Sequence, residues 1–155
     1  MPYIPSLHSP PRKKTLCIFS HDSNSTLSPP PDLQYDLRCV PSPPELVCEM
    51  YTGQSSEVRE GLLHESRFCE LLEQAKAEIQ GAMEAAGEEE EEGKSREAVV
   101  RVSCLCGSGH HRSVAFSEQL AQMEWPEDWE LELRHHDLIL QVKEQKERER
   151  QWRQM

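Results

Sequence analysis

Apolar and polar residues follow two different spacings along this chain of 155 residues. Mostly apolar runs at 15–19 and 99–105 predict buried strands, because a strand covered on both faces needs apolar side chains at successive positions. Alternation of apolar and polar residues at 33–39 and 129–133 predicts two more strands, each with one polar face. Four strands are therefore expected.

Helical spacing replaces alternation between residues 54 and 86, where apolar residues recur three, four and seven positions apart. Gly61 predicts a division of this segment into a short and a long helix. Another helix is expected after residue 113, and Trp125-Pro126 ends it. The periodic residues of the first segment are Val58, Leu62, Cys69, Leu72, Ile79 and Met83.

The predicted elements follow the order ββαβαβ and are followed by a charged helix. This order is typical of an α/β protein, and we expect a small three-layer domain with a central sheet of about four strands. A chain of this length has room for one domain with a modest core. We place that domain at 14–138, with an acidic linker at 87–97 inside it, a disordered tail at 1–13 and the charged helix at 139–155.

Acidic residues outnumber basic ones, and the formal net charge is −11 at pH 7. Five consecutive glutamates, Glu88–Glu92, belong to the linker, and without them the net charge of −11 would still be −6. This balance argues against general nucleic-acid binding, which needs a basic surface. The sequence has no apolar stretch long enough to span a membrane, and its start lacks the apolar core of a signal peptide. The spacing of its six cysteines is not that of a small disulfide-linked domain. We therefore expect an intracellular, cytoplasmic protein with free thiols.

The residues Cys106-Gly107-Ser108-Gly109-His110-His111-Arg112-Ser113 join a predicted strand to a predicted helix. In a strand, glycine turn and helix start, the backbone N–H groups of the loop and the positive end of the helix converge on one point. Arg112 adds a planar guanidinium that matches phosphate. The segment therefore predicts a phosphate cradle.

The same residues fit a second hypothesis, a cysteine-dependent phosphatase. Cys106, Arg112 and Ser113 have the Cys-x5-Arg-Ser spacing that places a nucleophilic thiolate beneath a phosphate. Leu105 stands where such enzymes usually have a histidine, and the candidates for a general acid are Asp22 and Asp137. Catalysis by Cys106 therefore stays an alternative to binding without turnover.

A metal site is a third hypothesis, because cysteines and histidines gather near the loop. Zinc ligands usually come in pairs spaced Cys-x2–4-Cys, whereas this chain has Cys104-x-Cys106 and adjacent histidines that diverge on a helix. We expect neither a metal nor a cofactor. The residues in question are Cys104, Cys106, His110, His111, His135 and His136.

Four motifs resemble the RapZ C-terminal domain family, in the same order as in that family. Gly109 and His111–Val114, with the strand before them, resemble its Cys-Thr-Gly-Gly-x-His-Arg-Ser-Val loop. Residues 35–43 are similar to its Asp-Val-Arg-Phe-Leu-Pro-Asn-Pro strand end, and Thr52-Gly53 matches its Leu-Thr-Gly. Residues 133–138 resemble its closing Arg-His-Arg-Asp/Thr-Leu. The resemblance extends from about Leu16 to Leu138.

The resemblance implies an α/β unit whose loop takes the phosphate of glucosamine 6-phosphate. The bacterial full-length relative is an RNA adaptor with an N-terminal P-loop domain. This chain has no Gly-x4-Gly-Lys-Ser/Thr motif and is acidic, so an RNA adaptor is our third-ranked function. We expect a sensor or regulatory module that binds a phosphosugar or nucleotide. The implied ligand-binding residues are Gly107, Ser108, Gly109, His110, His111, Arg112, Ser113, Arg38, Thr52 and His135.

Overall fold

A computed structural model describes residues 13–88, 97–138 and 150 of the chain. The predicted N-terminal tail up to residue 12, the centre of the acidic linker and nearly all of the C-terminal helix lie outside these residues, and Lys13, the last residue of that tail, begins β1. The elements are β1 (Lys13–Asp22), β2 (Leu33–Asp36), the 3₁₀ helix η2 (Leu37–Cys39), α1 (Glu45–Met50), α2 (Ser56–Leu63), α3 (Ser66–Glu88), β3 (Glu97–Cys106), α4 (Arg112–Ala121) and β4 (Glu130–His135).

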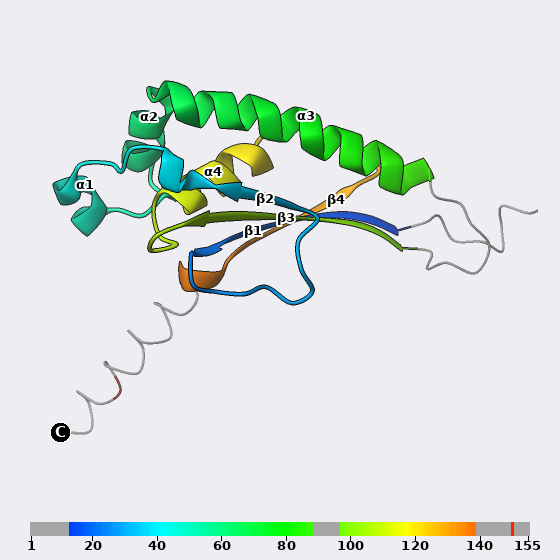
Figure 1. Ribbon diagram of the computed structural model, residues 1–155, viewed down its shortest axis with the longest axis horizontal. Coiled ribbons are helices and arrows are strands. Elements are labelled where there is room, and N and C mark those ends of the chain that lie inside the picture. The colour runs from blue at the N-terminus through cyan, green and yellow to red at the C-terminus, as the bar shows by residue number, and fades with distance from the viewer. Residues whose placement is uncertain (1–12, 89–96, 139–149, 151–155) are drawn as a thin grey trace, which may run out of the picture.

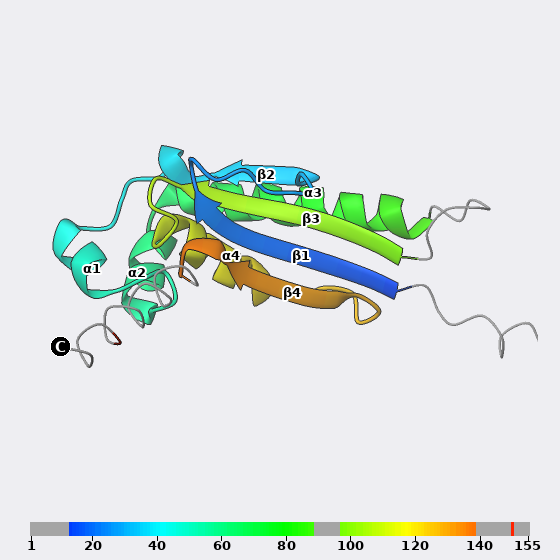
Figure 2. The same ribbon diagram turned by 90° about the horizontal axis from the view of Figure 1, so that it is seen from below.

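The four strands form one sheet in the order β2-β3-β1-β4, and all neighbouring strands are parallel. Helices α2, α3 and α4 lie over one face of the sheet, and the connection between β1 and β2 runs along the other face (Figures 1 and 2). Parallel neighbours need such crossovers because the end of one strand and the start of the next lie at opposite edges of the sheet. The structure confirms the predicted α/β class and the predicted small three-layer domain with a four-stranded sheet.

The topology brings the ends of β1 and β3 together at one edge of the sheet. Asp22 at the end of β1 is in register with Cys106 at the end of β3. From there the connection after β1 leaves towards β2, whereas the chain after β3 turns into α4 and continues to β4. Ligands of open α/β sheets bind where neighbouring strands diverge in this way. The glycine-containing loop after Cys106 occupies this place.

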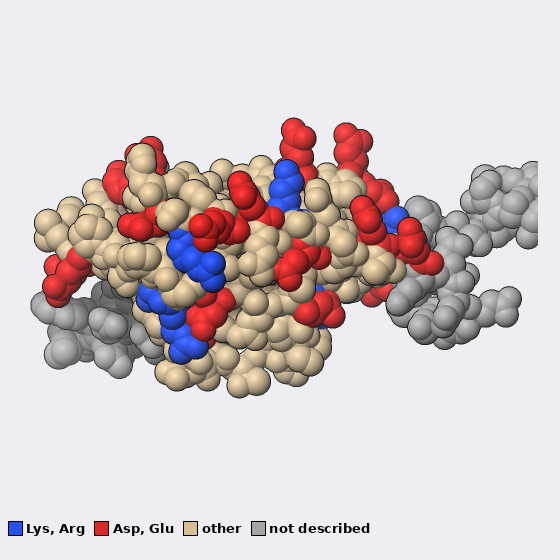
Figure 3. Space-filling model, turned by 45° about the horizontal axis from the view of Figure 1, so that its top comes forward, with Lys and Arg blue, Asp and Glu red and all other residues tan. Residues whose placement is uncertain are grey.

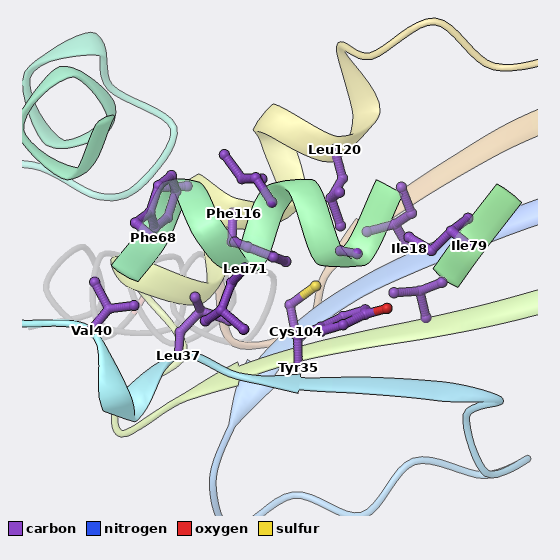
Figure 4. Packing of buried hydrophobic residues seen from close by; sticks show 14 of the residues in the cluster. Ile18, Tyr35, Leu37, Val40, Phe68, Leu71, Ile79, Cys104, Phe116 and Leu120 are labelled. Carbon is purple, nitrogen blue, oxygen red and sulfur yellow. The ribbon is translucent and has the colours of Figure 1, made fainter. Parts of the chain in front are cut away.

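An aromatic group at the centre of the core holds α4 against the sheet. Phe116 of α4 is fully buried between Tyr35 of β2, at 5.8 Å between ring centroids, and Phe68 of α3, at 5.6 Å. Figure 4 shows these rings packed with Leu120 and Ile18 between the helices and the strands. The core therefore fixes the helix whose first turn follows the loop.

The second strand is shorter than its alternating sequence predicts. The side chain of Asp36 accepts a hydrogen bond from the backbone N–H of Arg38, which turns the chain into η2. As a result Leu37 is buried while Cys39 is exposed, although both were expected on the same strand face. Short-range bonds from an aspartate to the following backbone compete with strand pairing in this way.

The long helical segment divides at a different place from the one expected. Gly61 lies within α2, and the division comes at His64, whose backbone N–H returns to the carbonyl of Gly61. The buried residue at the start of α3 is Phe68, and its neighbour Cys69 is half-buried. In the part of the chain that the structure describes, no helix has the length and apolar character needed to cross a lipid bilayer.

Candidate functional site

The loop between β3 and α4 requires a glycine at its centre. Gly109 has φ +75°, in the left-handed region that glycine adopts without a steric penalty. A Cβ atom at this position would overlap the carboxylate of Asp137 and lie 2.8 Å from the backbone nitrogen of Asp22. That nitrogen donates to Asp137 Oδ2 at 2.7 Å. The loop is thus packed against a carboxylate that the end of β1 holds in place.

The thiol of Cys106 points into the loop. Its sulfur accepts a hydrogen bond from the backbone N–H of Gly109 at 3.3 Å and lies 3.2 Å from the hydroxyl of Ser113. The backbone N–H groups of His111 and Ser113 also contact it. The sulfur therefore occupies the point on which the donors of the loop converge.

Two thiols on the same face of β3 have pKa values that are shifted in opposite directions. Burial raises the pKa of Cys106, but the hydroxyl of Ser113 and the surrounding backbone N–H groups outweigh burial and hold this pKa below its ordinary value. Burial raises the pKa of Cys104 to about 12, which the nearby Ser117 hydroxyl only partly offsets. Donors that favour a thiolate at Cys106 favour any other anion there as well.

We expect the thiolate absorbance at 240 nm to show a titration step below the pH of an ordinary thiol, and Cys106→Ser to remove that step. Because the pKa of Cys106 is lower in the folded protein than in the unfolded chain, the thiolate stabilises the fold at pH values above the ordinary thiol pKa. The contribution is lost as the pH falls through the lowered pKa. The matched variant Cys104→Ala should keep the step. A step that survives in Cys106→Ser would contradict the expectation.

Helix α4 begins without a side-chain cap. His111 is its N-cap residue and makes no side-chain capping hydrogen bond. The N–H groups of the first helical turn have no partner within a helix, and the helix dipole places partial positive charge at the same end. An anion in the loop would therefore meet donors from both the loop and the helix.

The Thr52-Gly53 turn lies directly against the loop. The backbone N–H of Gly53 donates to the carbonyl of His110 at 2.8 Å. A Cβ at Gly53 would overlap the carbonyl of His111 and the backbone nitrogen of Ala115. Thr52 itself accepts from the backbone N–H of Gln54 through its hydroxyl, at 3.3 Å. The turn supports the backbone of the cradle.

The two predicted arginines are held in different ways. Nη1 of Arg112 donates to backbone carbonyls of the η2 region, at 2.8 Å to Val40 and 3.3 Å to Leu37. Its Nη2 lies 3.9 Å from where a Cβ of Gly107 would be. The side chain of Arg38 instead forms a two-bond pair with Asp36. Arg112 thus connects the loop to η2, and Arg38 is directed towards Asp36 at the end of β2.

The histidines of the site are also engaged. His111 Nε2 donates to the carbonyl of Cys48 in α1 at 2.8 Å, and its ring lies edge-on to that of His110. His135 is buried, with Nδ1 2.7 Å from the Ser20 hydroxyl and Nε2 donating to Glu118 at 2.8 Å. It joins β4, β1 and α4, and neither ring nitrogen is left for a ligand at the loop.

The structure thus gathers residues 106–113 and Thr52 at one place and directs the side chains of Arg38 and His135 elsewhere. Sequence reasoning did not assign a role in the cradle to Gly53 or to the carbonyl of Cys48, and it considered Asp137 only as a catalytic acid. The Thr52-Gly53 pair, which matches the Leu-Thr-Gly of the RapZ C-terminal domain family, was the available signal for Gly53. Within the described ranges, no group of three or more potential ligand side chains could hold a metal ion.

Comparison with known proteins identifies the family of this chain. A family model described as the RapZ C-terminal domain matches residues 15–139. The chain belongs to the RapZ C-terminal domain family. Among curated proteins, a "Nucleotide-binding protein" of Jannaschia sp. (strain CCS1) is 31% identical over 122 residues, which is 77% of this chain. The aligned part is 36% of that relative, so the chain matches little more than a third of its length.

Family membership confirms the resemblance inferred from the motifs. Three of the motifs meet in the structure: the loop at 106–113, the Thr52-Gly53 turn against it, and Asp137 of the closing motif at Gly109. The fourth, at 35–43, supplies the carbonyls that hold Arg112. Motifs that are far apart in the sequence therefore meet around one loop.

Proposed function

We propose that the loop at 106–113 binds the phosphate group of a small molecule, a phosphosugar or a nucleotide, and that the protein is a sensor or regulatory module. The observation that carries the proposal is the convergence of backbone N–H groups from Gly109, His111 and Ser113 on the sulfur of Cys106. Donors arranged around one point bind an anion without further reorganisation. The name of the Jannaschia relative also points to a nucleotide.

In this proposal each part of the loop has a separate task. The backbone N–H groups of the loop and of the first turn of α4 bind the phosphate oxygens, while the positive charge of Arg112 lies beside them. Nη1 of Arg112 is fixed to η2, which leaves Nη2 near Gly107 for the ligand. His110 is half-buried at the rim and is available to the rest of the ligand. A nucleic acid is not proposed, since the protein has a net charge of −11 and its helical face carries many acidic side chains (Figure 3).

Arg112→Ala tests the proposal. We expect it to weaken binding of the best phosphosugar or nucleotide by about 2–3 kcal/mol, or roughly 30- to 150-fold, because a charge-assisted contact is lost. Calorimetry with a panel of phosphosugars and nucleotides measures the change.

Arg67→Ala is the matched control, since Arg67 lies on α3, pairs with Glu70 and carries the same charge. Binding that is equally strong in Arg112→Ala and the wild type contradicts the proposal. So does a panel in which no phosphorylated compound binds the wild type.

One observation favours phosphatase chemistry as a second function: the sulfur of Cys106 lies inside the cradle with a lowered pKa. A thiolate there would attack phosphorus, the bond to the leaving oxygen would break, and Asp137, next to Gly109, is the nearest candidate to protonate that oxygen. Water would then release phosphate from sulfur. We rank binding first, because the Cys106 side chain is almost fully covered, at 1% exposure.

A phosphatase predicts that the wild type hydrolyses an aryl phosphate and that Cys106→Ser abolishes turnover by at least about a thousandfold, as expected for loss of a nucleophile. The serine variant should still bind inorganic phosphate. Turnover that persists in Cys106→Ser would assign the activity to another source. If the wild type shows no turnover, the phosphatase hypothesis is wrong and only ligand binding is left.

A further inference from the structure

A groove separates helix α2 from the proline-rich segment that joins η2 to α1. It has a volume of about 270 Å³ and lies at the end of the molecule where α1 and α2 are found (Figures 1 and 2). Pro41 and Pro44 line one side, and Val58 and Leu62 of α2 form the base on the other side. No lysine or arginine among the described residues lines the groove.

Gly61 lies within α2 and opens onto this groove. The residue is exposed, and a Cβ atom at its position would meet nothing within 4 Å. Glycine is less favourable than alanine at such an open helix position, so the stability of α2 does not explain it. A glycine does let another molecule approach the helix backbone closely. An occupant of the groove therefore gives Gly61 a role.

Exposed apolar side chains gather on the two helices beside the groove. Leu46 of α1 is 68% exposed, Met50 of α1 is 66% exposed and Leu63 of α2 is 40% exposed. Leu46 and Leu63 each neighbour a lining residue in the sequence. Single exposed apolar residues are common on proteins, whereas several in one region mark an interaction surface. The groove and these side chains therefore indicate a site for a protein partner.

The charge of the same helices indicates which kind of partner fits. Residues 45–63 contain four glutamates and one arginine, a formal net charge of −3. Glu57 and Glu65 line the groove itself, and Figure 3 shows acidic side chains at this end of the molecule. Opposite charges attract across an interface, and like charges facing each other are costly. The surface therefore favours a basic partner over a second copy of this acidic chain or a nucleic acid.

The backbone around the groove determines the conformation of that partner. The groove lies between a helix and a proline-rich segment, not along the edge of a strand. Proline has no backbone N–H, and the backbone groups inside a helix bond to one another. An extended peptide would find few partners here for its own N–H and C=O groups. A helix satisfies these groups internally and presents side chains to the groove.

We propose that this groove binds an amphipathic, basic helix of a partner protein. An apolar side chain of that helix lies over Gly61, and its lysines or arginines pair with Glu57 and Glu65. The volume of about 270 Å³ is below the roughly 300 Å³ at which most small-molecule sites begin, and it suits the anchor side chains of a helix. The proposal does not depend on ligand binding at the phosphate loop.

Fluorescence anisotropy with the full chain tests the proposal. The probe is a labelled helical peptide of leucine and lysine, and the same peptide with glutamate in place of lysine is its control. The wild type should bind the lysine peptide and not the glutamate peptide. Gly61→Leu should weaken binding at least about tenfold, because its side chain fills the groove.

The melting temperature separates this effect from a loss of structure. Gly61→Leu should melt at the same temperature as the wild type or higher, because leucine has the higher helix propensity and the position is open. Gly81→Leu is the matched control, since Gly81 is an equally open position on α3. It should bind the lysine peptide as the wild type does.

Two pairs of charge reversals test the acidic side chains and decide the question if Gly61→Leu fails to fold. Glu57→Lys combined with Glu65→Lys should weaken the lysine peptide at least about tenfold. Glu84→Lys combined with Glu88→Lys makes the same change of charge at the far end of α3 and should have little effect.

Several outcomes overturn the proposal. The wild type does not bind the lysine peptide, Gly61→Leu binds it as tightly as the wild type, or both charge reversals weaken it equally. A wild-type dimer in sedimentation that Gly61→Leu dissociates would make a second copy the occupant. Arg112→Ala should bind the peptide as the wild type does, which separates this surface from the phosphate loop.

Discussion

Gly53→Ala should destabilise the fold by about 3 kcal/mol or more, at the upper end of the cost of adding a methyl group to a packed site. The added Cβ would overlap the carbonyl of His111 and the nitrogen of Ala115 and lie 2.8 Å from the Cβ of Val114. Two of these are backbone atoms at the start of α4, which no change of rotamer can move. The alanine therefore pushes the Thr52-Gly53 turn away from the loop. Urea denaturation measures the loss.

Gly81→Ala is the matched control for this substitution. Gly81 lies in the middle of α3, and a Cβ there meets nothing within 4 Å. Replacing a glycine in an open helix position should stabilise the fold by about 0.5–1 kcal/mol, because alanine has the higher helix propensity. The same change thus has opposite signs at the two sites. If Gly53→Ala proves as stable as the wild type, the turn does not support the loop as described.

The second large effect is expected for Phe116→Ala, at about 3–5 kcal/mol. The ring is fully buried and contacts Tyr35 and Phe68, so its removal leaves a cavity between α4, α3 and the sheet. The lost contacts hold the helix whose first turn follows the loop at 106–113. Thermal and urea unfolding of the variant measure the destabilisation.

Leu131→Ala on the edge strand β4 is the control for the loss of an apolar side chain. Leu131 is 41% exposed, so its truncation should cost less than about 1 kcal/mol. Equal losses for the two variants would mean that Phe116 does not hold the core together. A loss at Phe116 below about 1 kcal/mol would lead to the same conclusion, because the cavity term would be missing.

Much of the fold could be predicted because it depends on local pattern. Apolar runs and alternation located all four strands, and the spacing at 106–113 located the loop. The end of β2 was missed because the bond from Asp36 to the backbone of Arg38 competes with strand pairing, and alternation does not register this competition. Whether Phe68 or Cys69 is the buried residue at the start of α3 depends on how the helix is rotated against the sheet. The spacing of apolar residues does not determine this rotation.

The candidate site was predictable in its backbone and less so in its side chains. Glycines and a helix start imply convergent N–H groups wherever they occur after a strand. The direction of an arginine or a histidine depends on partners from distant segments. Arg112 contacts carbonyls more than 70 positions earlier in the chain, at Leu37 and Val40, and His135 contacts Ser20, 115 positions earlier. Such pairings follow from strand order, which the sequence pattern did not determine.

The carboxylate of Asp137 beneath Gly109 has a consequence for how the site assembles. Its hydrogen bond joins residues 115 positions apart, from the first strand to the residues after the last one. Contacts between such distant segments form late in folding, after the loop-closure entropy has been overcome by other interactions. The loop at 106–113 therefore gains this support only after β1 has paired with β4 and placed Asp137 beneath Gly109.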